Sequence, residues 1–159
     1  VAIVIIDTAE GLALLASHVT DASAVAVDTE FGRNKGSLSL VQIAFKQHCY
    51  LVDARDSLGT AYHELLRSTF EIVFDRIVLG WSFKEDSRRL ILLHDALRSQ
   101  LQDVRDLQPL ARRHLGLWQP PSLQRACAEI LGVALDKGNQ CSDWDHRPLT
   151  ASQQVYAAC

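Results

Sequence analysis

Three short runs of β-branched and other apolar residues follow one another in the first third of the chain, and they constrain its fold more than any other feature. The runs are Val25–Glu30, Leu38–Phe45 and His48–Asp53, each of a length typical of a β-strand. Only Lys46 and Gln47 separate the last two runs, which predicts a tight turn. Consecutive strands with such short connections run antiparallel, so we expect a three-stranded meander.

Helical and strand-like patterns alternate in the rest of the chain. Two segments have the spacing of a capping box, which predicts helices that open at Ser82 and at Thr150. Further strands are expected at Val1–Ile6 and Ile77–Trp81, and further helices at Leu12–Val19, Tyr62–Val73, Leu107–Leu115 and Leu123–Leu131. We therefore expect one α/β domain over residues 1–159, a mixed sheet flanked by helices.

Composition and charge narrow the class of protein. The chain is 48% hydrophobic and 22% charged, which excludes a disordered chain and allows a sizeable core. No apolar run approaches the roughly 20 residues of a membrane-spanning helix. The net charge is −3, whereas a nucleic-acid-binding protein usually carries a basic surplus. Either the chain does not bind nucleic acid, or the carboxylates of a metal site mask a local basic patch.

The cysteines and the first residue indicate the setting of the chain. The four cysteines, at positions 49, 127, 141 and 159, are widely scattered. This scatter is typical of reduced thiols in an intracellular protein, cytoplasmic or nuclear. Because the sequence begins with Val1 and contains no Met, we expect it to be a piece of a longer protein with other domains.

Asp28 and Glu30 are candidate metal ligands at the end of the strand Val25–Glu30. Side chains two residues apart on a strand point to the same face, so the two carboxylates should lie side by side. Their repulsion raises a pKa or requires a cation, and Mg²⁺ or Mn²⁺ prefers such oxygen ligands. A solvated strand end with no metal is the alternative, and the Asp-x-Glu pair by itself favours it.

Asp86 and Tyr156 are the other candidates. Asp86 shares a helix face with Leu90 and Leu93, and a carboxylate on an apolar stripe needs a partner. A metal, the helix dipole or an ion pair with Arg89 would each supply one. Tyr156 precedes small residues on a helix and, taken alone, is more often a core residue than a catalytic one.

Together these segments resemble the RNase D and Werner-type 3′–5′ exonucleases, the DEDD superfamily with a catalytic tyrosine. The first, second and third exonuclease motifs are matched by Val27–Phe31, by Gly80–Asp86 and by Tyr156–Cys159. Leu38–Ala44 and Ser142–Leu149 also resemble segments of the family. The resemblance runs nearly from end to end, and it implies an RNase H-like fold.

The resemblance also implies a mechanism. Asp28 would bridge two divalent ions, Mg²⁺ or Mn²⁺, Glu30 would bind one of them and Asp86 the other. Tyr156 would position the attacking water. The third motif, Tyr-x-x-x-Asp, would place a fourth carboxylate at position 160, after the last residue of this sequence. A protein of these 159 residues is therefore expected to be folded but essentially inactive and to bind the ions weakly.

The expected substrate is the 3′ end of a nucleic acid. The stretch from Leu135 to Pro148 resembles most the Nibbler-like, mutator-type branch, and the resemblance favours single-stranded RNA over DNA, although no residue reveals a 2′-hydroxyl contact. Candidate nucleic-acid contacts are Phe31, Arg33, Lys35, Leu40, Gln42, Lys137 and Arg147. For Phe31 and Leu40, core packing is an equal alternative to base stacking. For each cation, a solvated surface role is the alternative.

A second class of function remains open. The same fold could serve as a catalytically degenerate module that binds nucleic acid or scaffolds other proteins. The joint presence of Asp28, Glu30, Asp86 and Tyr156 favours an enzyme, since a module without chemistry would not need all four. The residue at position 160 separates the two readings.

Overall fold

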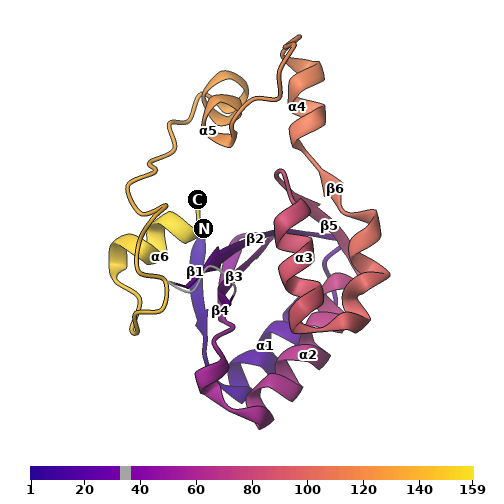
Figure 1. Cartoon of the computed structure of the whole chain (residues 1–159), viewed down its shortest axis with the longest axis vertical. Coiled ribbons are helices and arrows are strands. Elements are labelled where there is room, and N and C mark those ends of the chain that lie inside the picture. Colours follow the sequence, from indigo (N-terminus) through magenta and orange to yellow (C-terminus); the bar gives the residue numbers. More distant parts are fainter. Residues whose placement is uncertain (33–36) are drawn as a thin grey trace.

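In the computed structural model, which describes residues 1–32 and 37–159, six strands form one mixed sheet in the order β1-β4-β3-β2-β5-β6 (Figure 1). The strands are β1 (Ala2–Ile6), β2 (Ala24–Phe31), β3 (Leu38–Phe45), β4 (His48–Asp53), β5 (Ile77–Gly80) and β6 (Arg105–Asp106). β2, β3 and β4 pair antiparallel, which confirms the predicted meander. β1 runs parallel to β4, and β5 runs parallel to both β2 and β6.

Helices cover the sheet on both faces. The longer ones are α1 (Ala9–Val19), α2 (Thr60–Phe74) and α3 (Lys84–Leu93), and the shorter ones are α4 (Gln108–His114), α5 (Leu123–Ala126) and α6 (Ala151–Ala157). α1 and α2 lie against one face in Figure 1, and α6 lies against the other. Among the described residues, no helix is long and apolar enough to span a membrane.

The alternation of side chains along the strands divides the core into two clusters. The larger cluster joins Val25 and Val27 of β2 to Leu15 of α1 and Phe70 of α2. The smaller cluster, on the opposite face, gathers Leu40, Cys49, Leu51, Trp144 and Leu149 and contacts Tyr156. Because side chains on β2 alternate, those of Asp28 and Glu30 belong to this second face.

The predicted capping box at Ser82 is wrong. Ser82 has a left-handed backbone (φ 52°), α3 begins two residues later, and its N-cap residue, Phe83, makes no capping side-chain bond. Glu85 instead pairs with Arg88 and Arg89. The close approach of β5 explains this start, because a Cβ on Gly80 would lie 2.5 Å from the buried ring of Phe83. Packing of Phe83, rather than a capping hydroxyl, therefore sets where α3 begins.

The capping box predicted at Thr150 is confirmed, and Ser122 caps α5. The hydroxyl of Ser122 accepts a hydrogen bond from the backbone N–H of Arg125, and Thr150 forms the full capping box with Gln153. The helix expected over Leu123–Leu131 changes character along its length: α5 ends at Ala126, and a π-helical turn continues to Leu131.

Candidate active site

Asp28 and Glu30 lie where β2 extends past its shorter neighbour β5. The parallel pairing of the two strands ends at Ala26 and Leu79. The part of β2 that carries Asp28 and Glu30 therefore lies beyond its pairing with β5. On the other side, Asp28 is paired with Gln42 and Glu30 with Leu40 of β3. The two carboxylates therefore share the face covered by the C-terminal part of the chain, as the Asp-x-Glu spacing predicted.

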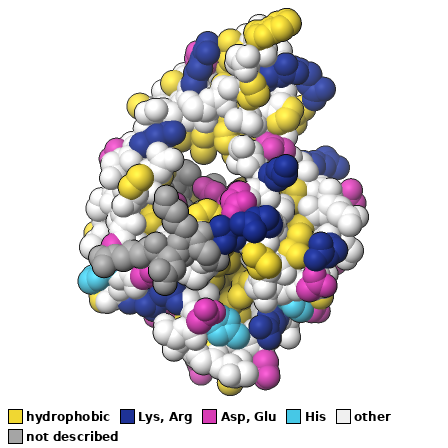
Figure 2. All heavy atoms as spheres, viewed as in Figure 1, with side chains coloured by type: hydrophobic (Ala, Val, Ile, Leu, Met, Phe, Trp, Pro, Cys, Tyr) yellow, Lys and Arg dark blue, Asp and Glu magenta, His cyan; other side chains and the backbone are white. Residues whose placement is uncertain are grey.

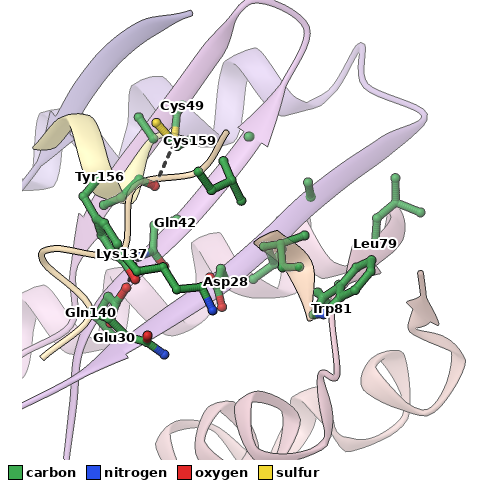
Figure 3. Close-up of a pocket in the computed structure, with 18 of the residues that line it drawn as sticks. Asp28, Glu30, Gln42, Cys49, Leu79, Trp81, Lys137, Gln140, Tyr156 and Cys159 are labelled. Atoms are coloured by element: carbon green, nitrogen blue, oxygen red, sulfur yellow. Dashed lines mark hydrogen bonds between the residues drawn. The ribbon is translucent and has the colours of Figure 1, made fainter. Parts of the chain in front are cut away.

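A cleft of about 490 Å³ opens over this face. Its polar part contains Asp28, Glu30, Gln42, Lys137 and Tyr156, which converge in the close-up of Figure 3. Its apolar part is lined by side chains from β3, β4, β5, α5 and α6 and from the segments that follow β5, β6 and α6. Among them are Ala44, Cys49, Leu79, Trp81, Leu107, Leu123, Ala157 and Ala158. The cleft thus combines an acidic floor with an apolar wall large enough to receive a planar group.

Asp86 reaches the same end of β2 from the first turn of α3. Its carboxylate accepts a hydrogen bond from the hydroxyl of Thr29, the residue between Asp28 and Glu30. It does not line the cleft directly, but its charge acts on both carboxylates of β2. The polar partner expected for Asp86 is thus the hydroxyl of Thr29 on β2. Asp86 is also close enough to Asp28 and Glu30 for its charge to raise their pKa values.

Burial weakens the acidity of Asp28, Glu30 and Asp86, and repulsion from the other carboxylates of the set adds to it for Asp28 and Glu30. Burial in the cleft, and then the charge of Asp86, raise the pKa of Asp28 to about 6, although solvent still reaches its side chain. Burial and the charge of Asp28 raise the pKa of Glu30 to about 8, against a weak hydrogen bond from Gln42. Burial also raises the pKa of Asp86, opposed by the Thr29 bond. A bound cation would relieve this repulsion.

Tyr156 is brought to the cleft by α6. Its ring packs beside that of Trp144, with the centroids 5.8 Å apart. Burial and the nearby charges of Glu30 and Asp28 raise the pKa of the Tyr156 phenol to about 12. The hydroxyl is therefore a neutral group that can donate a hydrogen bond near the acidic pair.

Gln42 is a buried amide on the cleft floor whose carbonyl oxygen is unused in hydrogen bonding among the described residues. Its Nε2 donates to Glu30 Oε1 over 3.4 Å, whereas its Oε1 has no hydrogen-bond partner among the described residues. Such an unsatisfied buried acceptor is uncommon and indicates a place for an incoming donor. The structure also adds Trp81 and Gln140 to the cleft, which the sequence did not single out. The sequence signal for Trp81 was its position within Gly80–Asp86, the segment that resembles the second exonuclease motif.

Leu40 and Arg147, two of the expected nucleic-acid contacts, make extensive contacts within the protein. Leu40 is 1% exposed and packs with Trp144, so core packing, the alternative reading, is what the structure shows. Arg147 donates through Nε to Asp53 at 2.7 Å and through its terminal nitrogens to the backbone carbonyls of Ser39 and Trp144, among others. The buried carboxylate of Asp53 attracts the guanidinium inward, a long-range pairing that the sequence did not reveal.

The remaining candidate contacts fall into three groups. Phe31 packs partly against the larger core cluster, and the guanidinium of Arg89 lies 5.6 Å from its ring centre. Lys137 is exposed and lines the cleft. Arg33 and Lys35 lie outside the described residues.

The donor set at this site fits divalent cations. Within residues 1–32 and 37–159, no three His, Cys, Asp or Glu side chains converge closely enough to enclose one ion. Mg²⁺ does not require such an enclosure, because it usually keeps several waters and binds through one or two carboxylates together with substrate phosphates. The mutual repulsion of Asp28 and Glu30 supplies a reason for a cation to bind there.

The acidic pair on β2 and the tyrosine on α6 thus line one cleft on a mixed sheet. The chain belongs to the 3′–5′ exonuclease family, whose family model matches residues 3–159. A curated relative, the exonuclease mut-7 homolog of Drosophila melanogaster, is 28% identical over 184 aligned residues. That alignment covers 98% of this chain but only 28% of the Drosophila protein.

Solved structures have the same fold. The Nibbler EXO domain of Aedes aegypti superposes with a TM-score of 0.80 at 22% identity, over 98% of this chain and 80% of the other. RNase D of Escherichia coli, an exoribonuclease involved in structured RNA processing, also gives a TM-score of 0.80, at 27% identity, over 99% of this chain and 41% of the other. The expected RNase H-like fold and the resemblance to RNase D and Nibbler-like exonucleases are confirmed.

Proposed function

We propose that this domain removes nucleotides from the 3′ end of a single-stranded nucleic acid by hydrolysing phosphodiester bonds with two divalent ions, Mg²⁺ or Mn²⁺. The observation that carries the proposal is the convergence of Asp28, Glu30 and the neutral hydroxyl of Tyr156 in one cleft. Membership of the 3′–5′ exonuclease family supports the direction of cleavage.

The side chains divide the work as follows. Asp28 interacts electrostatically with both Glu30 and Asp86. We therefore propose that Asp28 would hold both ions, that Glu30 would hold one of them, and that Asp86 would hold the other through water. When bound, such ions would supply activation of the attacking water and stabilisation of the leaving 3′ oxygen. The phenol of Tyr156 donates a hydrogen bond that fixes the direction of the attacking water, since its raised pKa keeps the proton on the oxygen.

We propose single-stranded RNA as the substrate. The support is that RNase D of Escherichia coli, which shares this fold, is an exoribonuclease. Within the cleft, the free Oε1 of Gln42 can accept a hydrogen bond from a sugar hydroxyl, and Lys137 can contact a phosphate. Phe31 remains a candidate stacking residue, held by Arg89 at the end of β2.

The fold alone would also suit a module that binds nucleic acid without cleaving it. The raised pKa values of Asp28 and Glu30 show that two carboxylates are crowded together in the cleft. Carboxylates repel phosphates, so a module that only binds nucleic acid would lose affinity from this pair, and the pair therefore favours the enzyme. A fourth carboxylate at position 160 would complete the set implied by the family motif, and we propose that residues 1–159 alone have little activity.

The setting of the domain is also part of the proposal. Since the chain spans 28% of the Drosophila relative, we expect other domains in the same protein to influence substrate choice. The four free cysteines accord with a reducing intracellular compartment.

Replacement of Asp28 tests the proposal. In a chain extended by its native residues, Asp28→Ala should lower Mg²⁺- or Mn²⁺-dependent trimming of a 3′-labelled single strand by more than about 100-fold. Loss of a residue that only supports a metal ligand usually lowers activity by about 10- to 100-fold, so a larger loss indicates a direct ligand. Asp75→Ala, which removes an exposed carboxylate after α2, is the matched control and should keep wild-type activity. Circular dichroism should show that both variants are folded. Activity of Asp28→Ala near the wild-type rate would contradict the assignment.

A further inference from the structure

A projecting arm, residues 107–135, extends the cleft away from the sheet. It consists of α4, the loop that follows it, α5 and the π-helical turn, and it rises above the sheet in Figure 1. Leu107 and Leu135 at the two ends of the arm, and Leu123 at the start of α5, line the cleft. A strand that leaves the cleft along this wall therefore passes onto the arm.

The arm has the opposite charge to the rest of the molecule. It contains Arg112, Arg113 and Arg125 and one acidic residue, Glu129, and so carries a net charge of +2. Because the whole chain carries −3, the other residues together carry −5. Arg113 is exposed and makes no ion pair within the described ranges. The basic surplus that the total charge concealed is thus concentrated on this projection.

The arm also exposes apolar side chains. Trp118 is 89% exposed, and Leu131 and Val133 are 69% and 51% exposed. In Figure 2, apolar and basic side chains gather on the projection above the main body. Cations at the C-terminal turn of α4 stabilise the helix dipole, but the dipole gives no reason for a fully presented tryptophan. An aromatic ring among cations is instead typical of single-strand binding surfaces.

The loop that carries Trp118 is held in place. Gly116 adopts a left-handed backbone (φ 63°). Its N–H donates to the carbonyl of Arg113 at 3.2 Å, and the N–H of Leu117 donates to the carbonyl of Arg112 at 3.0 Å. These two bonds form the Schellman motif that closes a helix. The side chain of Arg112 further reaches the carbonyl of Trp118 at 3.5 Å. The indole is therefore presented from a closed turn.

We propose that the arm is a second binding surface for the same nucleic acid, which holds the single strand upstream of the nucleotide in the cleft. Trp118 stacks on a base, and Arg113 with Arg112 contacts the neighbouring phosphates. Recognition of this kind is tolerant of sequence, because every base has a π-face. The inference rests on the proposed exonuclease function and adds a length requirement to it: only strands that extend beyond the cleft gain from the arm.

The test compares Trp118→Ala with Leu92→Ala, which removes a side chain 67% exposed on α3 and serves as the control. All proteins in the test are chains extended by their native next residues. Binding of a fluorescent single strand is measured by anisotropy without divalent ions, and cleavage is measured on a long strand and on a dinucleotide. Trp118→Ala should weaken binding of the long strand by about fivefold or more, the loss expected for one stacked base. The ratio of kcat/KM for the long strand over the dinucleotide should fall by a similar factor. Arg113→Ala should lower the salt dependence of binding, because one phosphate contact is lost.

The outcomes separate this inference from the proposed function. If the wild-type protein cleaves the long strand but Trp118→Ala and Leu92→Ala bind it equally, the arm inference is overturned and the proposed function stands. Unchanged strand binding together with altered self-association of Trp118→Ala would assign the surface to a protein partner and would also overturn it. A wild-type protein that neither binds nor cleaves a strand would overturn both.

Discussion

Glu30 shows at the scale of one residue how the site is prepared for a cation. Burial and the charges of its acidic neighbours Asp28 and Asp86 raise the pKa of its carboxyl to about 8, and the hydrogen bond that it accepts from Gln42 is weak. A metal ion that binds there at neutral pH must therefore displace a proton. Ion binding and protonation should compete at this group.

This competition predicts a pH-dependent stability of the metal-free protein. The pKa of Glu30 is raised on folding from 4.5 to about 8, so the folded state favours the protonated form. The stabilisation is complete below pH about 4.5 and is lost as the pH rises to about 8. Thermal unfolding followed by circular dichroism in a chelator should show Tm falling over this range. Added Mg²⁺ or Mn²⁺ should oppose the fall.

Two variants control the pH experiment. Glu30→Gln should remove the larger part of the slope, since the amide does not ionise. Glu64→Gln, an exposed position on α2, should retain the slope of the wild type. A metal-free wild-type protein whose Tm is constant or rises between pH about 4.5 and 8 would contradict the repulsion described for the acidic pair.

Tyr156→Phe tests the hydroxyl separately from the ring. The ring of the variant can keep its contact with Trp144, so α6 should remain in place. Because a group that orients water acts on the barrier and not on ground-state binding, kcat should fall by about 100-fold while KM changes little. Tyr50→Phe is the control, since Tyr50 belongs to the core cluster on the opposite face of the sheet. Steady-state kinetics of both variants in the extended chain would assign Tyr156 to the core if its kcat were unchanged.

At the scale of elements, a buried salt-bridge network joins the C-terminal segment to β4. Asp53 at the end of β4 is 2% exposed and pairs with both Arg55 and Arg147. Arg55 Nη1 also donates to the backbone carbonyl of Asp145 at 3.1 Å. The segment that precedes α6 is thereby fixed against the sheet, and this attachment places Tyr156 over the acidic pair.

Arg147→Ala should therefore act on stability. Removal of its charged hydrogen bonds to Asp53 should lower the free energy of unfolding by about 2 kcal/mol, because Arg55 keeps the buried carboxylate paired. Urea denaturation measures this loss. Arg88→Ala, which breaks an exposed pair with Glu85, should cost less than about 1 kcal/mol. Unchanged stability with weakened strand binding would restore Arg147 as a phosphate contact.

For the whole molecule, the decisive comparison is between residues 1–159 and the chain extended by its native next residues. The resemblance to the family motif implies an aspartate at position 160, four residues after Tyr156. The added carboxylate should strengthen Mn²⁺ binding, measured by calorimetry, and should allow trimming of a labelled single strand. Equal metal-dependent trimming by both proteins would show that a fourth carboxylate is dispensable.

Local patterns in the sequence determined the strands, most helices and the acidic face. The side-chain period of two on β2 put Asp28 and Glu30 on one face, and the short turn at Lys46 and Gln47 required antiparallel pairing, so neither needed tertiary information. The cap at Ser122 was equally local, because its partner is three residues away.

Only the tertiary structure decided which side chains pack in the core or pair with distant partners and which remain available to the site. Arg147 pairs with Asp53 across 94 residues, Leu40 is buried by Trp144, and Phe83 replaces Ser82 as the start of α3 because Gly80 packs against it. Each outcome depends on contacts between segments far apart in the chain or on local packing in three dimensions. Sequence periodicity predicts which face of an element a side chain occupies. The residues that it contacts there depend on how volume is packed and charge is paired in the folded protein.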